Sequence, residues 1–227
     1  VPEGTITALV GESGGGKSTV ANLIARFWDV DEGVIRVGGV DVREMDYKYW
    51  MEQVSIVFQD TNLFKMSIME NVAVFNPDAS REDVLQALHL AQCDDILEKL
   101  PQGADTVIGT KGIYLSGGEM QRIALARAIL KNAPVVLLDE ATAFADAENE
   151  YLIQKALDEL LRGKTVIMIA HRLSTTIHAD QICVLERGKI VEKGTHRELM
   201  DLHGVYAGMY EEYQSSISWR IGEEQYA

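Results

Sequence analysis

The sequence predicts an α/β fold built on a mainly parallel sheet, with an antiparallel β part near the N-terminus and an inserted α-helical subdomain. Three observations predict it. Short apolar runs typical of buried strands recur along the chain and alternate with segments of helical periodicity. The first run, residues 6–10, leads into a glycine-rich loop and then into a helical pattern. Between residues 61 and 131 the long β-branched runs disappear and helical patterns take over.

The N-terminal segment predicts strands around one helix. Residues 6–10 (ITALV) form a strand ending at Gly11, and residues 18–27 carry apolar side chains at helical spacing. Residues 34–42 (VIRVGGVDV) predict a hairpin that turns at two consecutive glycines. Residues 54–58 predict a further strand, which ends at a glutamine.

The middle segment is expected to be helical. Ser80 can cap a helix, because its hydroxyl can accept a hydrogen bond from a backbone N–H of the first turn. Pro101 ends the next helix, since proline lacks an N–H. A glycine-marked loop then leads into an alanine-rich helix over about residues 118–131.

The C-terminal segment returns to strands. Residues 135–138 and 165–169 are continuous apolar runs, as expected of strands buried on both faces of a parallel sheet. A helix containing residues 153–161 lies between them, residues 181–191 predict a hairpin turning at residues 187–188, and the tail from about residue 196 is helical and then polar.

The predicted core strands end in chemically useful groups. In open parallel sheets, ligands bind beyond the carboxyl ends of the strands. The groups directed to this rim are Gly11, Gln59, Asp139 and, one residue past its strand, His171.

Composition restricts the class of partner. The chain has 227 residues, of which 47% are hydrophobic and 25% charged, as in ordinary folded domains. Its net charge of −14 disfavours nucleic-acid binding, because such a chain repels the phosphate backbone. Two cysteines make neither a disulfide framework nor a metal cluster, and no apolar run approaches the roughly 20 residues that span a bilayer. Because the chain opens with Val1-Pro2-Glu3, just before a strand, we expect the polypeptide to continue upstream.

Residues 11–18 (GESGGGKS) match the pattern G-x-x-x-x-G-K-[ST] in full. Glycines let successive N–H groups curl around a phosphate, and the following helix presents its positive end to the same anion. A plain glycine-rich turn is the bland alternative, which the strand before and the helix after disfavour. The pattern therefore predicts a nucleoside triphosphate site, with the expected binding residues Gly11, Ser13, Gly14, Gly15, Gly16, Lys17, Ser18 and Thr19.

Two further segments fit the same chemistry. Asp139 can hold the shell of Mg²⁺, and the adjacent Glu140 can polarise the attacking water as a general base. Residues 115–119 (LSGGE) start a helix whose glycines again allow N–H groups to face an anion. One domain needs a single such helix start for one triphosphate, so the second is expected to serve a partner's nucleotide at an interface. Each segment alone could be an ordinary strand end or helix start.

The order and spacing of GESGGGKS, LSGGEMQR, VVLLDEAT and IAHRLSTT resemble the nucleotide-binding domain of ABC transporters over nearly the whole chain. The resemblance implies a P-loop NTPase (RecA-like) core over residues 1–60 and 132–227, and a helical subdomain over 61–131 that carries the signature motif. It also implies that Lys17 reaches the β- and γ-phosphates of ATP.

By the same resemblance, the rim residues acquire roles. Glu140, His171 and Gln59 are similar to the catalytic glutamate, the switch histidine and the Q-loop glutamine. Asp146 matches the D-loop aspartate at the dimer seam. The Mg²⁺ ligands would be Ser18, Gln59 and Asp139, and the residues that face the partner's γ-phosphate would be Ser116, Gly117 and Gly118.

The chain departs from the family pattern at four places. Glu119 stands where glutamine is usual, and adds negative charge beside the phosphate site unless it turns to cap the helix. The D-loop reads AFAD, so the packing at the seam is expected to differ. Thr110 replaces the glutamate of exporter-type domains, which puts one coupling contact in doubt. The adenine-stacking aromatic residue is missing from the ten residues before Gly11, so nucleotide affinity is expected to be lower.

The predicted function is therefore ATP binding and Mg²⁺-dependent hydrolysis that powers transport. The expected partners are a membrane domain of the same polypeptide and a second nucleotide-binding domain, at the cytoplasmic face of a bacterial inner membrane. The stretch LFKMSIMENV (63–72) resembles exporter-type domains, and LSGGE with AFAD resembles bacterial siderophore-handling members. The alternative is a non-transport ABC ATPase of DNA repair or translation, but the long coiled coils or basic linkers typical of those proteins are not seen here. A degenerate, non-hydrolysing domain is disfavoured by the intact motifs.

Overall fold

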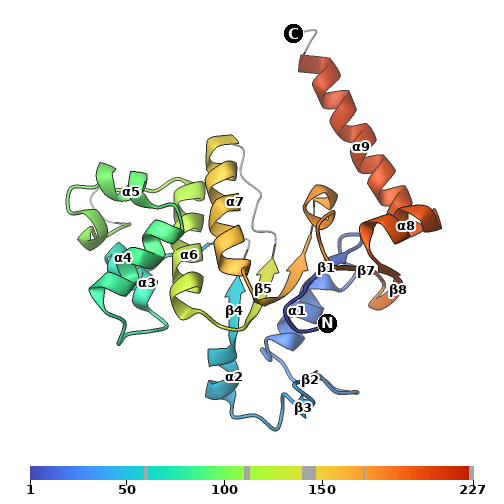
Figure 1. Ribbon diagram of the computed structural model, residues 1–227, viewed down its shortest axis with the longest axis horizontal. Coiled ribbons are helices and arrows are strands. Elements are labelled where there is room, and N and C mark those ends of the chain that lie inside the picture. Colours follow the sequence, from blue (N-terminus) through green and yellow to red (C-terminus); the bar gives the residue numbers. More distant parts are fainter. Residues whose placement is uncertain (59–60, 110–112, 140–146, 171, 225–227) are drawn as a thin grey trace.

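A six-stranded sheet forms the centre of the computed structural model, in the order β4-β5-β6-β1-β7-β8 (Figure 1). Its first five strands are parallel and β8 is antiparallel to β7. The structure describes residues 1–58, 61–109, 113–139, 147–170 and 172–224. The strands are β1 (Ile6–Val10), β4 (Val54–Val57), β5 (Val135–Asp139), β6 (Thr165–Ile169), β7 (Gln181–Glu186) and β8 (Lys189–Gly194). The predicted α/β fold with a mainly parallel sheet is confirmed.

A separate hairpin forms the antiparallel part. It pairs β2 (Arg36–Val37) with β3 (Val40–Asp41) and does not join the main sheet. The turn falls at Gly38 and Gly39, both at positive φ, as the sequence predicts. Each strand has two residues, so the hairpin is shorter than the predicted range of residues 34–42.

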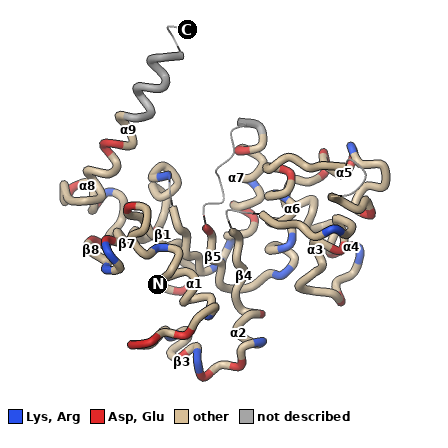
Figure 2. Tube along the Cα trace, turned by 180° about the vertical axis from the view of Figure 1, so that it is seen from behind, with Lys and Arg blue, Asp and Glu red and all other residues tan. Residues whose placement is uncertain are grey.

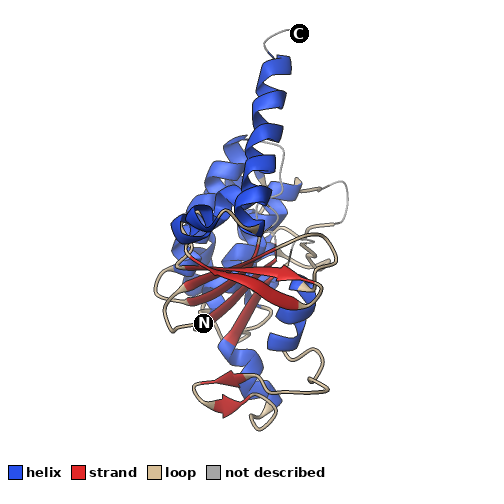
Figure 3. Ribbon diagram, turned by 90° about the vertical axis from the view of Figure 1, so that its right-hand side faces the viewer, coloured by secondary structure: helices blue, strands red, loops and turns tan. Residues whose placement is uncertain are grey.

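Helices cover both faces of the sheet (Figure 3). Because alternate strand residues point to opposite sides, each strand contributes side chains to the packing on both faces. Leu9 of β1 packs with α1 (Lys17–Ile24) and α2 (Tyr47–Gln53) on one face. Ala8 and Val10 pack on the other face with α8 (His196–Leu202) and the start of α9 (Val205–Glu224).

A third hydrophobic cluster joins the outer strands to the middle segment of the chain. It packs β4 and β5 against the long helices α6 (Gly117–Lys131) and α7 (Ala147–Leu161). The shorter elements of this layer are α3 (Ile68–Ala73), α4 (Arg81–Leu90), α5 (Asp94–Lys99) and the 3₁₀ turn η1 (Gly103–Asp105). Figure 1 shows these helices gathered beyond β4 and β5, on the far side from α1.

Serine caps fix where three helices of this layer, α3, α4 and α6, begin. The Ser80 hydroxyl accepts from the N–H of Asp83, whose carboxylate in turn accepts from the N–H of Ser80, so the predicted cap is a full capping box. Ser67 forms the same arrangement with Glu70 at α3, a helix that the sequence analysis did not predict. Hydrogen bonds from Ser67 lower the pKa of the Glu70 carboxyl, which keeps that cap charged.

The C-terminal tail is helical from His196, as predicted, and the helices extend to Glu224. Between β6 and β7 lies the 3₁₀ turn η2 (Leu173–Thr176), and α9 extends outward from the body of the domain (Figures 1 and 3). Within the part of the chain that the structure describes, no helix is long and apolar enough to cross a membrane. Figure 2 shows acidic and basic residues interspersed over the described elements.

Candidate functional site

The phosphate loop connects the end of β1 to the start of α1 in a backbone path that requires glycine. Gly11, at φ +142°, lies so close to β7 that a Cβ there would be 2.1 Å from the Leu185 carbonyl oxygen. A Cβ on Gly15 would lie 3.1 Å from the same oxygen, and Gly14 and Gly16 have φ values of +79° and +102°. Close approach to β7 at Gly11 and Gly15 and positive φ at Gly14 and Gly16 therefore favour glycine along the loop, as in a backbone cradle for an anion.

Lys17 brings positive charge into this loop. Its side chain is 5% exposed, and its Nζ donates to the carbonyl oxygens of Gly11 and Glu12 at 2.8 and 2.9 Å. The turn between β7 and β8 supports the loop from outside, since the Gly188 N–H donates to the Gly15 oxygen at 3.0 Å. A buried ammonium beside backbone N–H groups, at a helix start, favours a multiply charged anion.

The remaining loop residues lie on the accessible side. Ser13, Ser18 and Thr19 are exposed, and Ser18 and Thr19 belong to the first turn of α1. Their hydroxyls can therefore reach a ligand that sits on the helix N-terminus.

The sheet order places Gly11 and Asp139, two of the four predicted rim residues, at the same edge of the sheet. β4, β5, β6 and β1 are adjacent and parallel, so their carboxyl ends lie at that edge. Asp139 is the last residue of β5 and pairs in register with Ile169 of β6. The other predicted residues of this edge and seam, Gln59, Glu140, Asp146 and His171, lie outside the residues that the structure describes.

The second glycine segment starts α6 as predicted. Ser116 is the N-cap, and its hydroxyl accepts from the N–H of Glu119 at 3.3 Å. The Glu119 carboxylate folds back and accepts from the N–H of Ser116 at 2.8 Å. Its negative charge therefore caps the helix start, which is the second of the two orientations that the sequence allows. Gly118 is buried, and a Cβ there would lie 2.8 Å from Cγ of Asn149 in α7. Glycine is needed at Gly118 for close packing of the two helices.

A buried arginine, the last residue of the LSGGEMQR segment, holds the start of α6, a structural role that the motif alone does not predict. The Arg122 side chain is 1% exposed and donates to both carboxylate oxygens of Asp95 in α5, at 2.6 and 3.1 Å. It also donates to the Gln92 carbonyl and to Asn149 Oδ1. Burial opposes ionisation of Asp95, but hydrogen bonds from Arg122 and Lys99 outweigh it, so the pKa of Asp95 is lowered. The pair ties α6 to α5 directly behind the Ser-Gly-Gly start.

A second missed network fixes the loop that precedes α3. The Asn71 side chain is fully buried, accepts from the N–H of Phe64, and donates to the carbonyls of Phe64 and Ser67. Arg127 of α6 donates to the Asn71 carbonyl at 2.8 Å and lies over the Phe64 ring. Burial lowers the pKa of Arg127 from its usual high value. This network connects α6 to the segment that begins two residues after Gln59.

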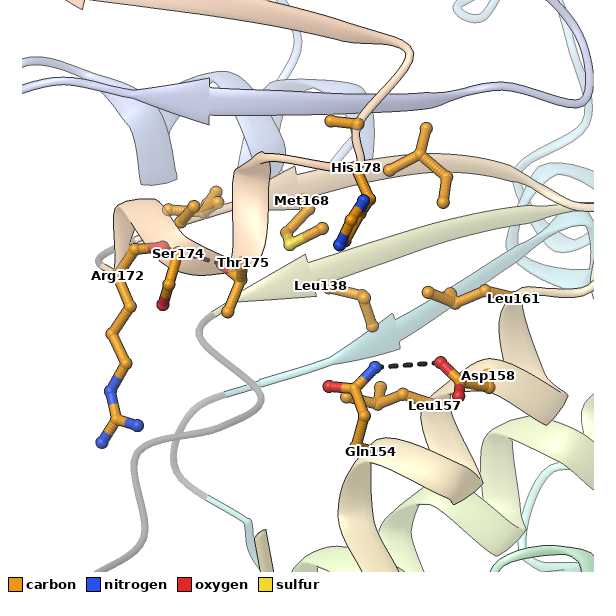
Figure 4. Close-up of a pocket in the computed structure, with 14 residues that line it drawn as sticks. Leu138, Gln154, Leu157, Asp158, Leu161, Met168, Arg172, Ser174, Thr175 and His178 are labelled. Carbon is orange, nitrogen blue, oxygen red and sulfur yellow. Dashed lines mark hydrogen bonds between the residues drawn. The ribbon is translucent and has the colours of Figure 1, made fainter. Parts of the chain in front are cut away.

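A cavity of about 330 Å³ lies between α7 and η2 (Figure 4). Figure 4 shows Gln154 and Asp158 on one side, with Ser174, Thr175 and His178 on the other, and Leu138 and Met168 of the sheet between them. These strand residues face away from α1, so the cavity is distinct from the phosphate loop.

Comparison with known proteins gives the same assignment as the motifs. The family model described as "ABC transporter" matches residues 1–143. The chain is 54% identical over 208 residues to the mycobactin import ATP-binding/permease protein IrtA of Mycolicibacterium smegmatis, covering 92% of the chain and 24% of that protein. It is 46% identical to the ATP-dependent lipid A-core flippase of Legionella pneumophila, covering 99% of the chain and 38% of the flippase. A bacterial Atm1-family ABC exporter solved with ATP bound superposes with a TM-score of 0.86 at 42% identity, over 93% of this chain and 37% of the exporter chain.

Proposed function

Because the chain belongs to the ABC transporter family, as one of its ATP-hydrolysing domains, we propose that two such domains close head to tail on ATP and thereby drive a substrate across a membrane. The chain spans about a quarter to two fifths of the length of the relatives it matches. The remaining length would supply the membrane domain, to which this chain would be fused. We propose that the chain lies at the cytoplasmic face of a bacterial inner membrane.

One observation carries the head-to-tail arrangement. The phosphate loop and the Ser116 helix start belong to different hydrophobic clusters, since α1 packs on one face of the sheet and α6 on the other. Figure 1 shows the two helices well apart in one chain. A single nucleotide that touches both must therefore lie between two copies, with the phosphate loop of one copy opposite the α6 start of the other. Asp146 would lie at the seam between them.

Within each site, the chain's own groups divide the work. Lys17 and the loop N–H groups would bind the β- and γ-phosphates, and Ser116, Gly117 and Gly118 of the partner would face the γ-phosphate. Glu140 would accept the proton of the attacking water, and His171 and Gln59 would orient the reacting groups. These roles follow the family's motif, position by position.

The residues present fit Mg²⁺ as the metal. The described residues contain no cluster of three or more His, Cys, Asp or Glu side chains that could hold an ion by themselves. Mg²⁺ is usually bound through one or two protein oxygen ligands, keeps several waters and takes substrate phosphates as further ligands. Ser18 at the start of α1 and Asp139 at the end of β5 would hold it, together with Gln59. The ion would neutralise charge on the phosphates.

The division of the chain also follows from this proposal. Residues 1–60 and 132–227 would form the ATP-binding core, and residues 61–131 the helical subdomain. The Asn71 network supports it, since it ties α6 to α3 within 61–131, whereas Arg122 bonds both to Asp95 of α5 and to Asn149 of α7 across the proposed boundary. Lys131 joins the two parts, because its Nζ donates to the carbonyls of Met51 and Val54 in the core.

The test compares Glu140→Gln with the wild type in the full-length protein. ATP turnover should fall by about 100-fold or more, the usual contribution of a general base. ATP binding should remain, and the ATP-bound variant should elute as a dimer on size exclusion. Glu98→Gln, on the exposed surface of α5, is the matched control and should behave as the wild type. Unchanged turnover in Glu140→Gln would exclude Glu140 as the base, and persistent monomers with ATP would count against the sandwich.

A further inference from the structure

The segment that follows His171 is held by the C-terminal helices. The 3₁₀ turn η2 begins two residues after His171 and is closed by hydrogen bonds from the Thr175 N–H to the Arg172 carbonyl and from the Ala179 N–H to the Thr176 carbonyl. On its outer side, Arg172 forms an ion pair with Glu150 of α7 at 3.1 Å. On its inner side it meets α8 and α9.

A chain of three hydrogen bonds crosses this inner contact. His196 Nδ1 lies 2.8 Å from the Tyr206 hydroxyl, which lies 3.3 Å from the Thr176 hydroxyl, which donates to the Leu173 carbonyl at 2.8 Å. Each hydroxyl has one hydrogen, and that of Thr176 goes to the carbonyl. Tyr206 must then donate to Thr176, and His196 must donate from Nδ1 to Tyr206. The three hydrogen bonds thus donate in one direction, from α8 through α9 into η2.

Burial and a helix cap fix the positions of the residues in this series of hydrogen bonds. Tyr206 and Thr176 are both fully buried. The Glu192 carboxylate of β8 accepts from the N–H groups of Val205 and Tyr206 and caps the start of α9, with a distance of 2.9 Å to Tyr206. Burial raises the pKa of Tyr206, so the phenol stays protonated and able to donate.

The same contact reaches the phosphate loop through the core. Tyr206 packs in one cluster with Val10, the residue before Gly11, and with Ala170, the residue before His171. Leu173 of η2 lies in this cluster as well. The end of β1 that leads into the loop and the residue after β6 are therefore backed by the hydrophobic cluster that contains Tyr206, and no role in nucleotide contact explains the hydroxyl that this tyrosine directs at η2.

We propose that Tyr206 and His196 are positioning residues for hydrolysis, which act by holding the η2 turn, the described segment that follows the predicted switch histidine along the chain. This inference rests on the proposed function of the chain as an ATPase. It predicts that loss of the Tyr206 hydroxyl lowers the rate of hydrolysis more than the affinity for ATP, because the phosphate loop and Lys17 are retained.

The test uses the full-length protein with Tyr206→Phe, which keeps the ring and removes the hydrogen bonds. The matched control is Tyr210→Phe, because Tyr210 stacks on Tyr206 in the same cluster and its hydroxyl accepts from Gln214 instead of touching η2. Tyr206→Phe should lower kcat roughly tenfold while KM for ATP stays within about twofold. Tyr210→Phe should leave both unchanged.

Two further measurements separate positioning from simple destabilisation. Hydrogen exchange of the Thr175 and Ala179 amides should quicken in Tyr206→Phe and not in Tyr210→Phe. In a Thr176→Val background, Tyr206→Phe should lower kcat by less than twofold, because both changes break the same bond. If η2 exchange and kcat are unchanged while the wild type hydrolyses ATP, the positioning role is overturned. If the wild type itself does not hydrolyse ATP, it is the proposed function that fails.

Discussion

Replacement of Asp95 by asparagine tests the pair that fixes the signature helix. The Asp95 carboxylate accepts two bonds from Arg122, whose side chain is 1% exposed. Removing one member of a fully buried pair costs about 3–5 kcal/mol, since a charge is left without its partner. The Asp95 side chain is 42% exposed, so water screens the interaction, and asparagine still accepts one bond. We therefore expect Asp95→Asn to lower the free energy of unfolding of the 227-residue chain by about 1–3 kcal/mol at pH 7, measured by urea titration.

The pH dependence of this difference has a defined sign. The folded-state pKa of Asp95 is lowered, because the hydrogen bonds from Arg122 and Lys99 outweigh the opposing effect of burial. The contribution of a carboxylate with a depressed pKa is complete above its unfolded value of about 3.9 and is lost as the pH falls through the folded value. The difference between wild type and variant should be constant from pH 7 to pH 5 and shrink below pH 4.

Asp94→Asn is the matched control. Asp94 occupies the same first turn of α5, but it pairs with exposed His89 and its own side chain is 56% exposed. Its effect on the free energy of unfolding should stay within about 0.5 kcal/mol. Equal effects of the two variants, or a difference for Asp95→Asn that persists unchanged at pH 3, would refute the reasoning that the buried ion pair is the cause.

Three further outcomes follow from the same structure. Gly11→Ala should weaken ATP binding at least tenfold in a nucleotide titration, because its Cβ would meet a β7 carbonyl at 2.1 Å, whereas Gly4→Ala, at positive φ in open space, should leave binding unchanged. Glu119→Gln should keep kcat within about twofold, since glutamine preserves the capping box, while Glu119→Ala should lower the free energy of unfolding by about 1 kcal/mol. Burial raises the pKa of Cys93 to about 12 and also raises that of Cys183, so a thiol reagent at pH 8 should label neither in the native chain and both in urea.

The features that can be predicted from the sequence are those that depend on residues close together in the chain. The strand of residues 165–169 was predicted with its observed bounds, because a buried parallel strand is a continuous apolar run. The cap at Ser80 was predicted because its partner lies three residues away. The helix over Tyr47–Gln53 was missed, because its aromatic residues have no marked helical preference. It forms because Trp50 is buried against α1, with Nε1 donating to the Ile24 carbonyl.

The candidate site likewise contains contacts between residues that are close in the sequence, which can be predicted, and contacts between distant residues, which cannot. The phosphate loop and the Ser116 helix start are short contiguous motifs, so their residues were predicted together. The Arg122–Asp95 pair joins residues 27 apart, and the Tyr206–Thr176 contact joins residues 30 apart. No local pattern connects such partners, because a charged or hydroxyl side chain has the same sequence signature whether it meets water or a buried acceptor. These contacts appear only once the sheet order has brought their elements together.

The departure at Glu119 is compatible with the anion site proposed at the start of α6. The capping box uses the N–H groups of Ser116 and Glu119, and it does not involve those of Gly117 and Gly118. The Ser116 hydroxyl accepts through its oxygen, so its hydrogen can still be donated to a phosphate. The carboxylate stabilises the positive end of α6 in each copy, while Gly118 against Asn149 and Arg122 on Asp95 hold that end in place. In the proposed head-to-tail pair, a γ-phosphate of the partner's ATP would meet donors that are already oriented, and closure would require little rearrangement of α6.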